Sequence, residues 1–367
     1  MRVVVTGSDG FIARNLRVRL RELGQDDLTG ISRTTTAAEF SEALAAADIV
    51  FHLAGVNRPR EVAEFTHGNV DLTARLCAEL AASGRRTPIV YTSSTQAALD
   101  GPYGRSKLAA EELLLRHGRE TGAPVHVFRL TNVFGKWSRP HYNSVVATFC
   151  HQIANGLPIT VDDASASLRL VYVDDVVDAF VELLGGGASG YLEAGPVYET
   201  TVGELAGTLK EFAAGDSLMA PRVGSGFRRA LYATYVSHLP FERFAYQVPR
   251  YGDERGVFVE MLKTPDCGQF SYFSAKPGIT RGEHYHHTKV EQFLVIQGSA
   301  RFRFRHLVSG ESHELTIRGG EGRVVFSIPG WAHDVTNVGP DDLLIMLWAS
   351  ELFDRARPDT VRSKVMP

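Results

Sequence analysis

Two groups of side chains in this sequence have the types and spacing that chemistry needs. The first begins with a glycine-rich turn at residues 6–13 (TGSDGFIA), which follows an apolar strand and opens a helix. Glycines in such a turn let the backbone approach a pyrophosphate at the helix N-terminus. Tyr103 and Lys107 follow, one helical turn apart. A nearby Lys⁺ lowers a tyrosine pKa from about 10, which predicts that Tyr103 protonates a carbonyl that receives hydride.

The end of the second predicted strand indicates which nicotinamide cofactor this turn would hold. Residues 30–33 (GISR) offer no acidic side chain for a ribose 2′-hydroxyl, but Arg33 could pair with a 2′-phosphate. This predicts NADPH rather than NADH. The alternatives are that Arg33 is a solvated surface residue and that the glycine turn is purely structural.

The second group is a set of histidines near the C-terminus. His284, His286 and Glu291 fit the pattern G-x5-H-x-H-x4-E-x6-G, and His333 stands in a G-x2-H-x3-N segment. Alternate residues of a strand face the same side, so both histidines of the pair can point inward while the next strand brings Glu291 back. Three histidines and a carboxylate suit Zn, Fe, Mn or Ni. The alternatives are core histidines, or acid and base groups of a metal-free barrel with His284 as ligand or base.

The elements that must position these residues change in character along the chain. The predicted strands 3–5, 49–53, 89–91 and 125–130 alternate with the predicted helices 15–23, 71–82 and 104–119, the βαβ rhythm of a parallel sheet. Short strands at 270–275, 292–296, 300–306, 314–317, 323–328 and 343–348 predict an all-β barrel or jelly roll. The expected fold class is α/β, a Rossmann-type parallel sheet followed by a jelly-roll barrel. The expected domains are 1–244, connector included, and 245–367.

Composition and charge exclude several classes of protein. A chain of 367 residues with 44% hydrophobic and 22% charged residues has the composition of a folded protein of about two domains. Its 39 basic and 42 acidic residues give a net charge of -3, which disfavours nucleic acid and an anionic membrane as partners. Its three separated cysteines indicate neither disulfides nor a thiolate zinc site. With no signal peptide or transmembrane run expected, the predicted location is the cytoplasm.

Over roughly residues 1–240, the order of the motifs resembles the extended short-chain dehydrogenase/reductase family. The glycine turn, HLAG at 52–55, the serine-rich 92–94, the Tyr/Lys pair, RLTNVFG at 129–135 and RLVYVDD at 169–175 carry this resemblance. It implies a catalytic triad of Ser94, Tyr103 and Lys107, and a substrate diphosphate held by Asn132 and Arg169. The implied cofactor-binding residues are Gly7, Asp9, Gly10, Phe11, Ile12, Arg33, Leu53, Ala54, Gly55 and Lys107.

The histidine segments resemble the cupin family over roughly residues 245–365. This resemblance implies a divalent metal, with zinc favoured, whose ligands are His284, His286, Glu291 and His333. The stretch GDERGVF at 252–258 is similar to the D-x-R-G-x-F segment of the metal-free dTDP-4-keto-6-deoxyhexose 3,5-epimerases. That similarity implies a substrate contact by Arg255.

A reductase followed by an epimerase-like cupin resembles, over the whole chain, the bifunctional capsular polysaccharide enzymes of the CapF/WbjC type. HLAGVNRP at 52–59, FGKW at 134–137, YNSV at 142–145 and HYHHTK at 284–289 carry this resemblance. It implies a homodimer that epimerises a UDP-2-acetamido-2,6-dideoxy-4-hexulose at C3 and reduces C4 with NADPH, for capsule or O-antigen synthesis. The implied product is UDP-2-acetamido-2,6-dideoxy-L-talose. The alternatives are another 4-keto nucleotide sugar, or a cupin that serves only as a structural or dimerisation module.

Overall fold

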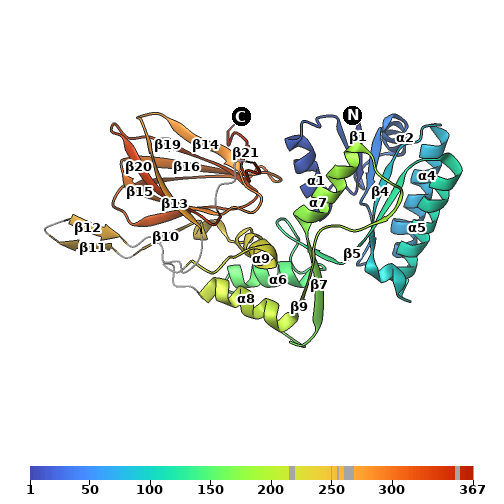
Figure 1. The fold of residues 1–367 in the computed structure, drawn as a ribbon, viewed down its shortest axis with the longest axis horizontal. Coiled ribbons are helices and arrows are strands. Elements are labelled where there is room, and N and C mark those ends of the chain that lie inside the picture. The colour runs from blue at the N-terminus through green and yellow to red at the C-terminus, as the bar shows by residue number, and fades with distance from the viewer. Residues whose placement is uncertain (215–219, 249, 254–255, 260–267, 352–355, 367) are drawn as a thin grey trace. The chain divides into compact units, whose positions relative to one another are not determined.

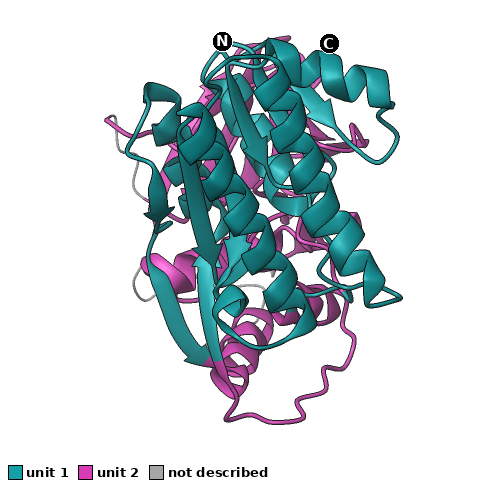
Figure 2. Cartoon of the chain, turned by 90° about the vertical axis from the view of Figure 1, so that its right-hand side faces the viewer, with its two compact units in different colours: residues 1–134, 141–144, 168–200 teal, residues 135–140, 145–167, 201–367 magenta. Residues whose placement is uncertain are grey.

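The computed structural model describes residues 1–367 except 215–219, 249, 254–255, 260–267, 352–355 and 367 (Figure 1). For residues 250–253, 256–259 and 269 it describes the backbone alone. The chain divides into two compact units (Figure 2). Unit 1 comprises residues 1–134, 141–144 and 168–200, and unit 2 comprises 135–140, 145–167 and 201–367.

A six-stranded parallel sheet in the order β2-β1-β3-β4-β5-β8 forms the centre of unit 1. Its strands are β1 (Val3–Thr6), β2 (Leu28–Ile31), β3 (Ile49–His52), β4 (Ile89–Ser94), β5 (Val125–Leu130) and β8 (Gly190–Leu192). β1 and β3 are buried along their whole length, because their apolar runs suit a sheet covered on both faces. The strand order reverses between β1 and β3, and parallel sheets bind ligands at the carboxyl ends beside such a reversal.

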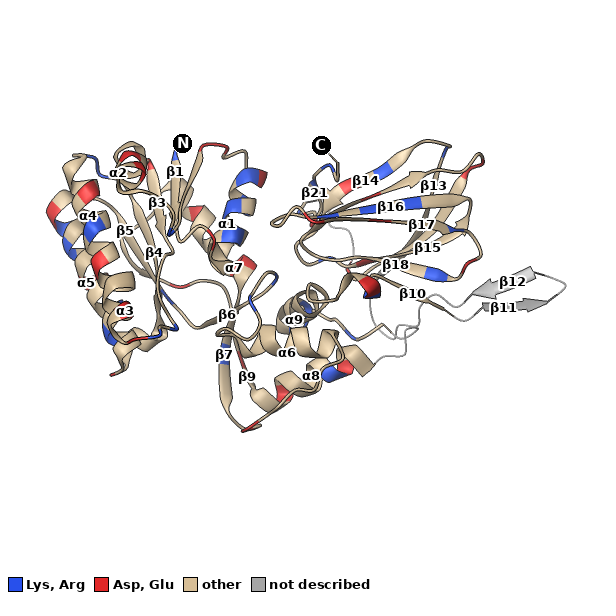
Figure 3. Cartoon of the chain, turned by 180° about the vertical axis from the view of Figure 1, so that it is seen from behind, with Lys and Arg blue, Asp and Glu red and all other residues tan. Residues whose placement is uncertain are grey.

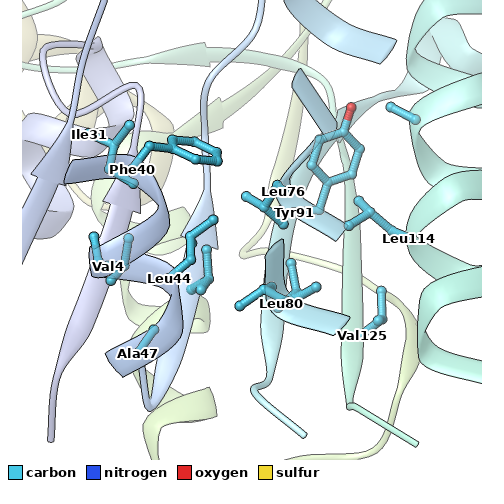
Figure 4. Close-up of a cluster of buried hydrophobic side chains, with 14 of the residues drawn as sticks. Val4, Ile31, Phe40, Leu44, Ala47, Leu76, Leu80, Tyr91, Leu114 and Val125 are labelled. Atoms are coloured by element: carbon cyan, nitrogen blue, oxygen red, sulfur yellow. The ribbon is translucent and has the colours of Figure 1, made fainter. Parts of the chain in front are cut away.

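Helices accompany the strands of this sheet. They are α1 (Phe11–Glu22), α2 (Ala37–Ala46), α3 (Ala63–Phe65), α4 (Leu72–Ala82), α5 (Pro102–Thr121) and α7 (Val173–Glu182), with the short turns η1 (Thr66–Asp71), η2 (Thr95–Ala98) and η3 (Leu183–Gly185). α5 begins with a proline at its first turn and ends at Gly122, whose φ of 75° favours glycine. Leu44, Leu80, Tyr91 and Leu114 belong to the core between strands and helices (Figure 4). This core fixes α5 against the sheet.

A smaller sheet, β6-β7-β9, continues from the end of β5. Its strands are β6 (Asn132–Phe134), β7 (Ser167–Tyr172) and β9 (Val197–Thr201). β6 and β7 run parallel, with Asn132 paired to Leu170. Figure 3 marks charged residues on the helices and on β16, whereas β1, β3 and β4 contain none.

Unit 2 contains a helical layer and a set of antiparallel strands. Its helical segments are α6 (Val145–Ala154), α8 (Val202–Ala214), α9 (Gly226–Val236) and η4 (Phe241–Arg243). The three longer helices pack on one another. Phe212 of α8 lies 5.1 Å from Tyr232 of α9, centroid to centroid, within this layer.

Two five-stranded antiparallel sheets form the C-terminal part of unit 2, in the orders β10-β18-β15-β20-β13 and β17-β16-β19-β14-β21. Their strands are β10 (Ala245–Gln247), β13 (Gln269–Ala275), β14 (Thr280–Tyr285), β15 (Glu291–Gln297), β16 (Ser299–His306), β17 (Ser312–Arg318), β18 (Arg323–Ser327), β19 (Trp331–Asn337), β20 (Leu343–Ala349) and β21 (Val361–Arg362). β11 (Arg250–Asp253) and β12 (Gly256–Val259) form a separate hairpin. Phe293, Phe302, Ile317 and Ile345 belong to the apolar core of these sheets.

The predicted fold class is confirmed, since a parallel α/β sheet precedes an all-β antiparallel region. A strand carrying His284, here β14, had been expected without bounds, whereas β19, which carries His333, and β21 had not been predicted. Among the described residues, no helix combines the length and the apolar character that crossing a membrane requires.

Candidate functional site

The glycine-rich turn lies where β1 ends and α1 begins. Gly7 has a φ of 65°, and a Cβ at this position would lie 2.7 Å from Ala54 Cα, so glycine allows the ends of β1 and β3 to meet. Gly10 caps α1, whose first turn has no acidic residue and no side-chain cap. The first-turn amides are therefore available for an anion, as a pyrophosphate site requires. Asp9 is exposed, and Phe11 and Ile12 start the helix.

Arg33 lies two residues beyond the end of β2. In the sheet, β2 lies on one side of β1, and β3, which leads to Ala54, lies on the other. The Ser8 amide donates to the Ile31 carbonyl at 3.1 Å, which ties the end of β2 to the glycine turn. Arg33 is exposed. An exposed guanidinium beside the turn is compatible with contact to a nucleotide phosphate.

A buried hydrogen-bond chain fixes the loop after β3, which contains Leu53, Ala54 and Gly55. The Ala54 amide donates to Thr6 Oγ1 at 3.2 Å, and Thr6 Oγ1 lies 2.8 Å from His52 Nδ1. His52 Nε2 lies 2.9 Å from Thr73 Oγ1, and that hydroxyl donates to the Asn69 carbonyl. Because the Thr73 proton is already used, His52 must donate from Nε2 and accept at Nδ1. Burial, followed by the charge of Lys107, lowers the pKa of His52 to about 3, consistent with this neutral ring.

Asn69, which had not been predicted from the sequence, holds the next part of the same loop. Its side chain accepts from the Val56 amide at 2.7 Å and donates to the Val56 carbonyl at 3.0 Å and to Ser106 Oγ at 2.9 Å. A Cβ at Gly55 would lie 3.0 Å from Asn69 Oδ1 and 3.6 Å from Lys107 Nζ. Asn69 lies in the π-helical turn η1, so no regular spacing marked it.

Ser94, Tyr103 and Lys107 come together at the carboxyl end of β4 and the start of α5. Ser94 ends β4 and hydrogen-bonds to the half-buried Tyr103. The connection between them is one 3-10 turn, η2, which packs so closely that a Cβ at Gly104 would lie 2.2 Å from the Gln96 carbonyl oxygen. Gly104 therefore makes the short connection sterically feasible.

Lys107 is buried and points back toward β4. Its Nζ donates to the Thr92 carbonyl at 2.6 Å and lies 4.4 Å from the centroid of the Tyr91 ring. Burial lowers the pKa of Lys107 to about 7, against the opposing influence of Glu111. Burial raises the pKa of Tyr103, although the hydrogen bond with Ser94 lowers it. The expectation that Lys107 would lower the tyrosine pKa was therefore wrong for this structure, in which Tyr103 is a neutral phenol and so holds a proton to donate.

A second buried network, also missed from the sequence, lies one helical turn beyond Lys107. The fully buried Glu111 accepts from Arg129 Nε at 3.0 Å and from Arg129 Nη2 at 2.7 Å. The same carboxylate accepts from Ser93 Oγ, and from the Tyr191 hydroxyl at 2.9 Å. These contacts connect α5 to β4, β5 and β8, and so fix the helix that carries Tyr103 beside the strand that carries Ser94.

The proposed diphosphate residues lie on neighbouring strands of the small sheet. Asn132 begins β6 and pairs with Leu170 of β7, and Arg169 directly precedes Leu170. Both are exposed, and Arg169 Nε lies 3.4 Å from Glu199 Oε1. Arg255, the third predicted substrate contact, lies outside the described residues.

The second candidate centre, in unit 2, joins His284, His286, Glu291 and His333. Their ligand atoms all lie within 4.8 Å of one another. Glu291 Oε2 is 3.9, 3.1 and 3.3 Å from Nε2 of the three histidines in chain order. The imidazoles hold the pKa of Glu291 well below its usual range despite its burial, and burial lowers the pKa of His333 to about 4. The cluster thus offers an ionised carboxylate and a neutral ring for a cation.

A β-bulge decides which side His284 faces. Gly282 pairs with Asp334 and His284 with His333, so Glu283 is an extra residue with a φ of 54°. If Glu283 were instead paired regularly with His333, His284 would lie opposite Ala332 and would face away from His333. Strand alternation was predicted to relate His284 to His286, and the bulge is what brings His284 onto the same face as His333.

Hydrogen-bond partners also orient the rings of two of the histidines through their Nδ1 atoms. Ser327 Oγ lies 2.9 Å from His333 Nδ1, and the Asp359 carbonyl accepts from His286 Nδ1. Among the described residues, Nε2 of His284 and of His333 is buried without a hydrogen-bond partner. Orphaned inward nitrogens around a carboxylate fit a divalent metal held by three histidines and Glu291.

The chain belongs to the NAD dependent epimerase/dehydratase family, whose family profile matches residues 3–191. Residues 251–361 match the polysaccharide biosynthesis C-terminal domain. The chain is 51% identical to the UDP-2-acetamido-2,6-beta-L-arabino-hexul-4-ose reductase of Pseudomonas aeruginosa, over 100% of this chain and 99% of the relative. The UDP-glucose 4-epimerase of Mycolicibacterium smegmatis is 30% identical, over 56% of this chain and 80% of the relative.

Among solved structures, the capsular polysaccharide assembling protein CapF from Staphylococcus aureus is 39% identical. The match covers 100% of both chains with a TM-score of 0.68. The predicted membership of the CapF type is confirmed by these full-length relatives.

Proposed function

We propose that this chain reduces C4 of UDP-2-acetamido-2,6-dideoxy-4-hexulose with NADPH, after its C-terminal barrel, a cupin, has epimerised C3. The observation that carries the proposal is that one chain holds both the Ser94, Tyr103 and Lys107 group and the cluster of four metal-type ligands. The relative named as a reductase of a UDP-linked 4-hexulose supports the substrate class. The product would be UDP-2-acetamido-2,6-dideoxy-L-talose, for capsule or O-antigen synthesis.

In the reduction, Tyr103 delivers the proton. NADPH, when bound, would supply a hydride to C4, and the carbonyl π electrons would go to O4. The phenol then transfers its proton to O4, and Ser94 holds the phenol through their hydrogen bond. Lys107, buried beneath the loop after β3, supplies positive charge when it is protonated, and this charge stabilises the tyrosinate left behind. Arg33 would pair with the 2′-phosphate, and the turn with Gly7 and Gly10 would hold the pyrophosphate.

In the epimerisation, the C4 ketone makes the C3 proton acidic. The four ligands His284, His286, Glu291 and His333 would hold a divalent metal, zinc by preference, and a bound metal would polarise the ketone oxygen. A base removes the C3 proton, and reprotonation on the other face inverts the centre. Reduction of C4 afterwards removes the acidifying ketone, so the new configuration is retained.

Proton exchange at C3 and hydride transfer at C4 can be tested separately in one tube. The protein is incubated in D₂O with the 4-hexulose and no NADPH while NMR follows the C3 proton, and NADPH is then added. We expect loss of the C3 signal first and oxidation of NADPH afterwards. Tyr103→Phe should keep the exchange and lose the reduction by about 10²–10⁴-fold, and His333→Gln should lose the exchange.

The controls are residues of the same types outside both centres. Tyr272 is 75% exposed on β13, and His313 lies on β17 beside Glu311, so Tyr272→Phe and His313→Gln should leave both steps unchanged. Reduction of the 4-hexulose without prior exchange would refute the epimerase half and favour a cupin that only stabilises or dimerises the protein. Exchange without NADPH oxidation would refute the reductase half.

The same proposal includes the domain boundary at residues 244/245 and a homodimer. Light scattering on the purified chain tests the dimer. Activity with a different 4-keto nucleotide sugar, and none with the UDP-linked 4-hexulose, would keep the chemistry and replace the substrate.

A further inference from the structure

The C-terminal segment Asp359–Val365 contacts the cluster of four candidate ligands, and the residues beside them, at several points. The segment contributes β21, which pairs with β14 at His284 and Tyr285 (Figure 1). Arg305 of β16 donates to the Val365 carbonyl at 3.0 Å, to the Lys364 carbonyl at 2.8 Å and to Ser363 Oγ at 3.1 Å. β14 therefore holds the middle of the segment, and Arg305 holds its C-terminal half.

The carboxylate of Asp359 caps the turn that joins β14 to β15. It accepts from the amides of His287, Thr288 and Lys289 at 2.8, 2.7 and 2.7 Å, and from Thr288 Oγ1 at 3.0 Å. This turn begins directly after His286 and ends just before Glu291. A rigid turn sets the separation of these two ligands, whose Nε2 and Oε2 atoms lie 3.1 Å apart.

The backbone of the same segment acts on two of the histidines. The Asp359 carbonyl accepts from His286 Nδ1, which leaves the Nε2 lone pair directed at the cluster. The Ser363 amide donates to the Glu283 carbonyl at 2.8 Å, which holds the left-handed bulge residue that directs His284 inward. Three of the four ligands thus depend on contacts from this one segment.

We propose that the segment Asp359–Val365 is a positioning element of the metal centre, with the Asp359 carboxylate as its main positioning residue. The inference rests on the proposed metal site. Asp359 is not one of the four ligands, and acts by keeping His286 and Glu291 where they would hold a divalent ion. Supporting groups of this kind change metal affinity by about 10–100-fold.

The test compares zinc affinity in Asp359→Asn, Asp359→Ala and Asp163→Asn, each in the full chain. Asparagine keeps one oxygen that can accept from the turn amides, whereas alanine keeps none. Asp163 is the matched control because its Oδ1 also caps a turn in unit 2, accepting from the Ser165 amide at 2.8 Å and Ser165 Oγ at 2.6 Å, yet it is no member of the cluster. Affinity is measured by competition with a chromophoric chelator, at a temperature at which circular dichroism shows every metal-free variant folded.

We expect the zinc dissociation constant to rise about tenfold in Asp359→Asn and about a hundredfold in Asp359→Ala, with Asp163→Asn at the wild-type value. If the Asp359 variants melt at lower temperature but bind zinc with wild-type affinity, the carboxylate serves stability alone and the inference is overturned. If the wild-type chain itself binds no zinc, manganese, iron or nickel, the proposed metal site fails, and the inference fails with it. These two failures are distinguished by the wild-type titration.

Discussion

Replacing Gly7 with alanine tests whether the glycine turn is shaped for a nucleotide. Gly7 and Gly24 both have left-handed backbone, with φ of 65° and 75°. A Cβ at Gly7 would meet Ala54 Cα at 2.7 Å and the Ala54 amide nitrogen at 2.8 Å, whereas a Cβ at Gly24 would meet nothing within 4 Å. Gly24→Ala is therefore a control that has the backbone strain without the collision.

The expected free-energy changes follow from these two terms. Left-handed backbone costs an L-residue about 1–2 kcal/mol, which applies to both variants. The collision at Gly7 is with main chain, which has no flexible end to move aside, and overpacking of this kind costs about 1–3 kcal/mol more. We therefore expect Gly7→Ala to lose about 2–5 kcal/mol of unfolding free energy and Gly24→Ala about 1–2 kcal/mol.

Two assays measure the effects of these substitutions, one on stability and one on NADPH binding. Chemical unfolding followed by circular dichroism gives the stability difference, and the fluorescence of NADPH on titration gives binding. Gly7→Ala should also weaken NADPH binding, because Ala54 must move away from the turn, while Gly24→Ala should bind NADPH as the wild type does. Equal destabilisation in the two variants, or normal NADPH binding by a folded Gly7→Ala protein, would refute the reasoning.

Three further outcomes are expected. The pKa of Lys107 is about 7 in the folded chain and 10.5 when free, so the unfolded chain binds one more proton between these pH values. The unfolding free energy, relative to that of Lys107→Met, should therefore rise by about 1.4 kcal/mol per pH unit in this range. Unfolding measured at pH 7.5 and 9 would reveal this rise. Glu111→Gln should lose about 1.5–3 kcal/mol of unfolding free energy, because Arg129 loses its carboxylate partner. Glu112→Gln on the same helix should lose almost none, and equal losses in the two variants would contradict the buried network. Removing divalent metal with a chelator should lower the melting temperature of the wild type more than that of His333→Gln, and an equal decrease would argue against the four-ligand site.

The sequence determined the parts of the site that depend on local spacing. A glycine turn after an apolar strand predicts the β1 to α1 junction, and four-residue spacing places Tyr103 and Lys107 one turn apart on α5. The two histidine segments identified all four members of the cluster before the fold was known. The glycine turn and the Tyr103/Lys107 pair depend on contacts within a few residues, whereas the cluster was predicted from two separate motifs that the fold brings together.

Only the tertiary structure decided the groups that hold these residues in place. Asn69, Glu111 and Asp359 contact partners 37, 18 and 72 residues away along the chain, and no local pattern records such pairs. The bulge at Glu283 adds one residue to a strand, which changes the face of His284 without changing the spacing of the motif. The tyrosine pKa likewise depends on burial by the whole fold, which a Tyr-x-x-x-Lys spacing does not contain. The sequence therefore determined which side chains are available for chemistry, and long-range packing decided their direction, their charge and their supports.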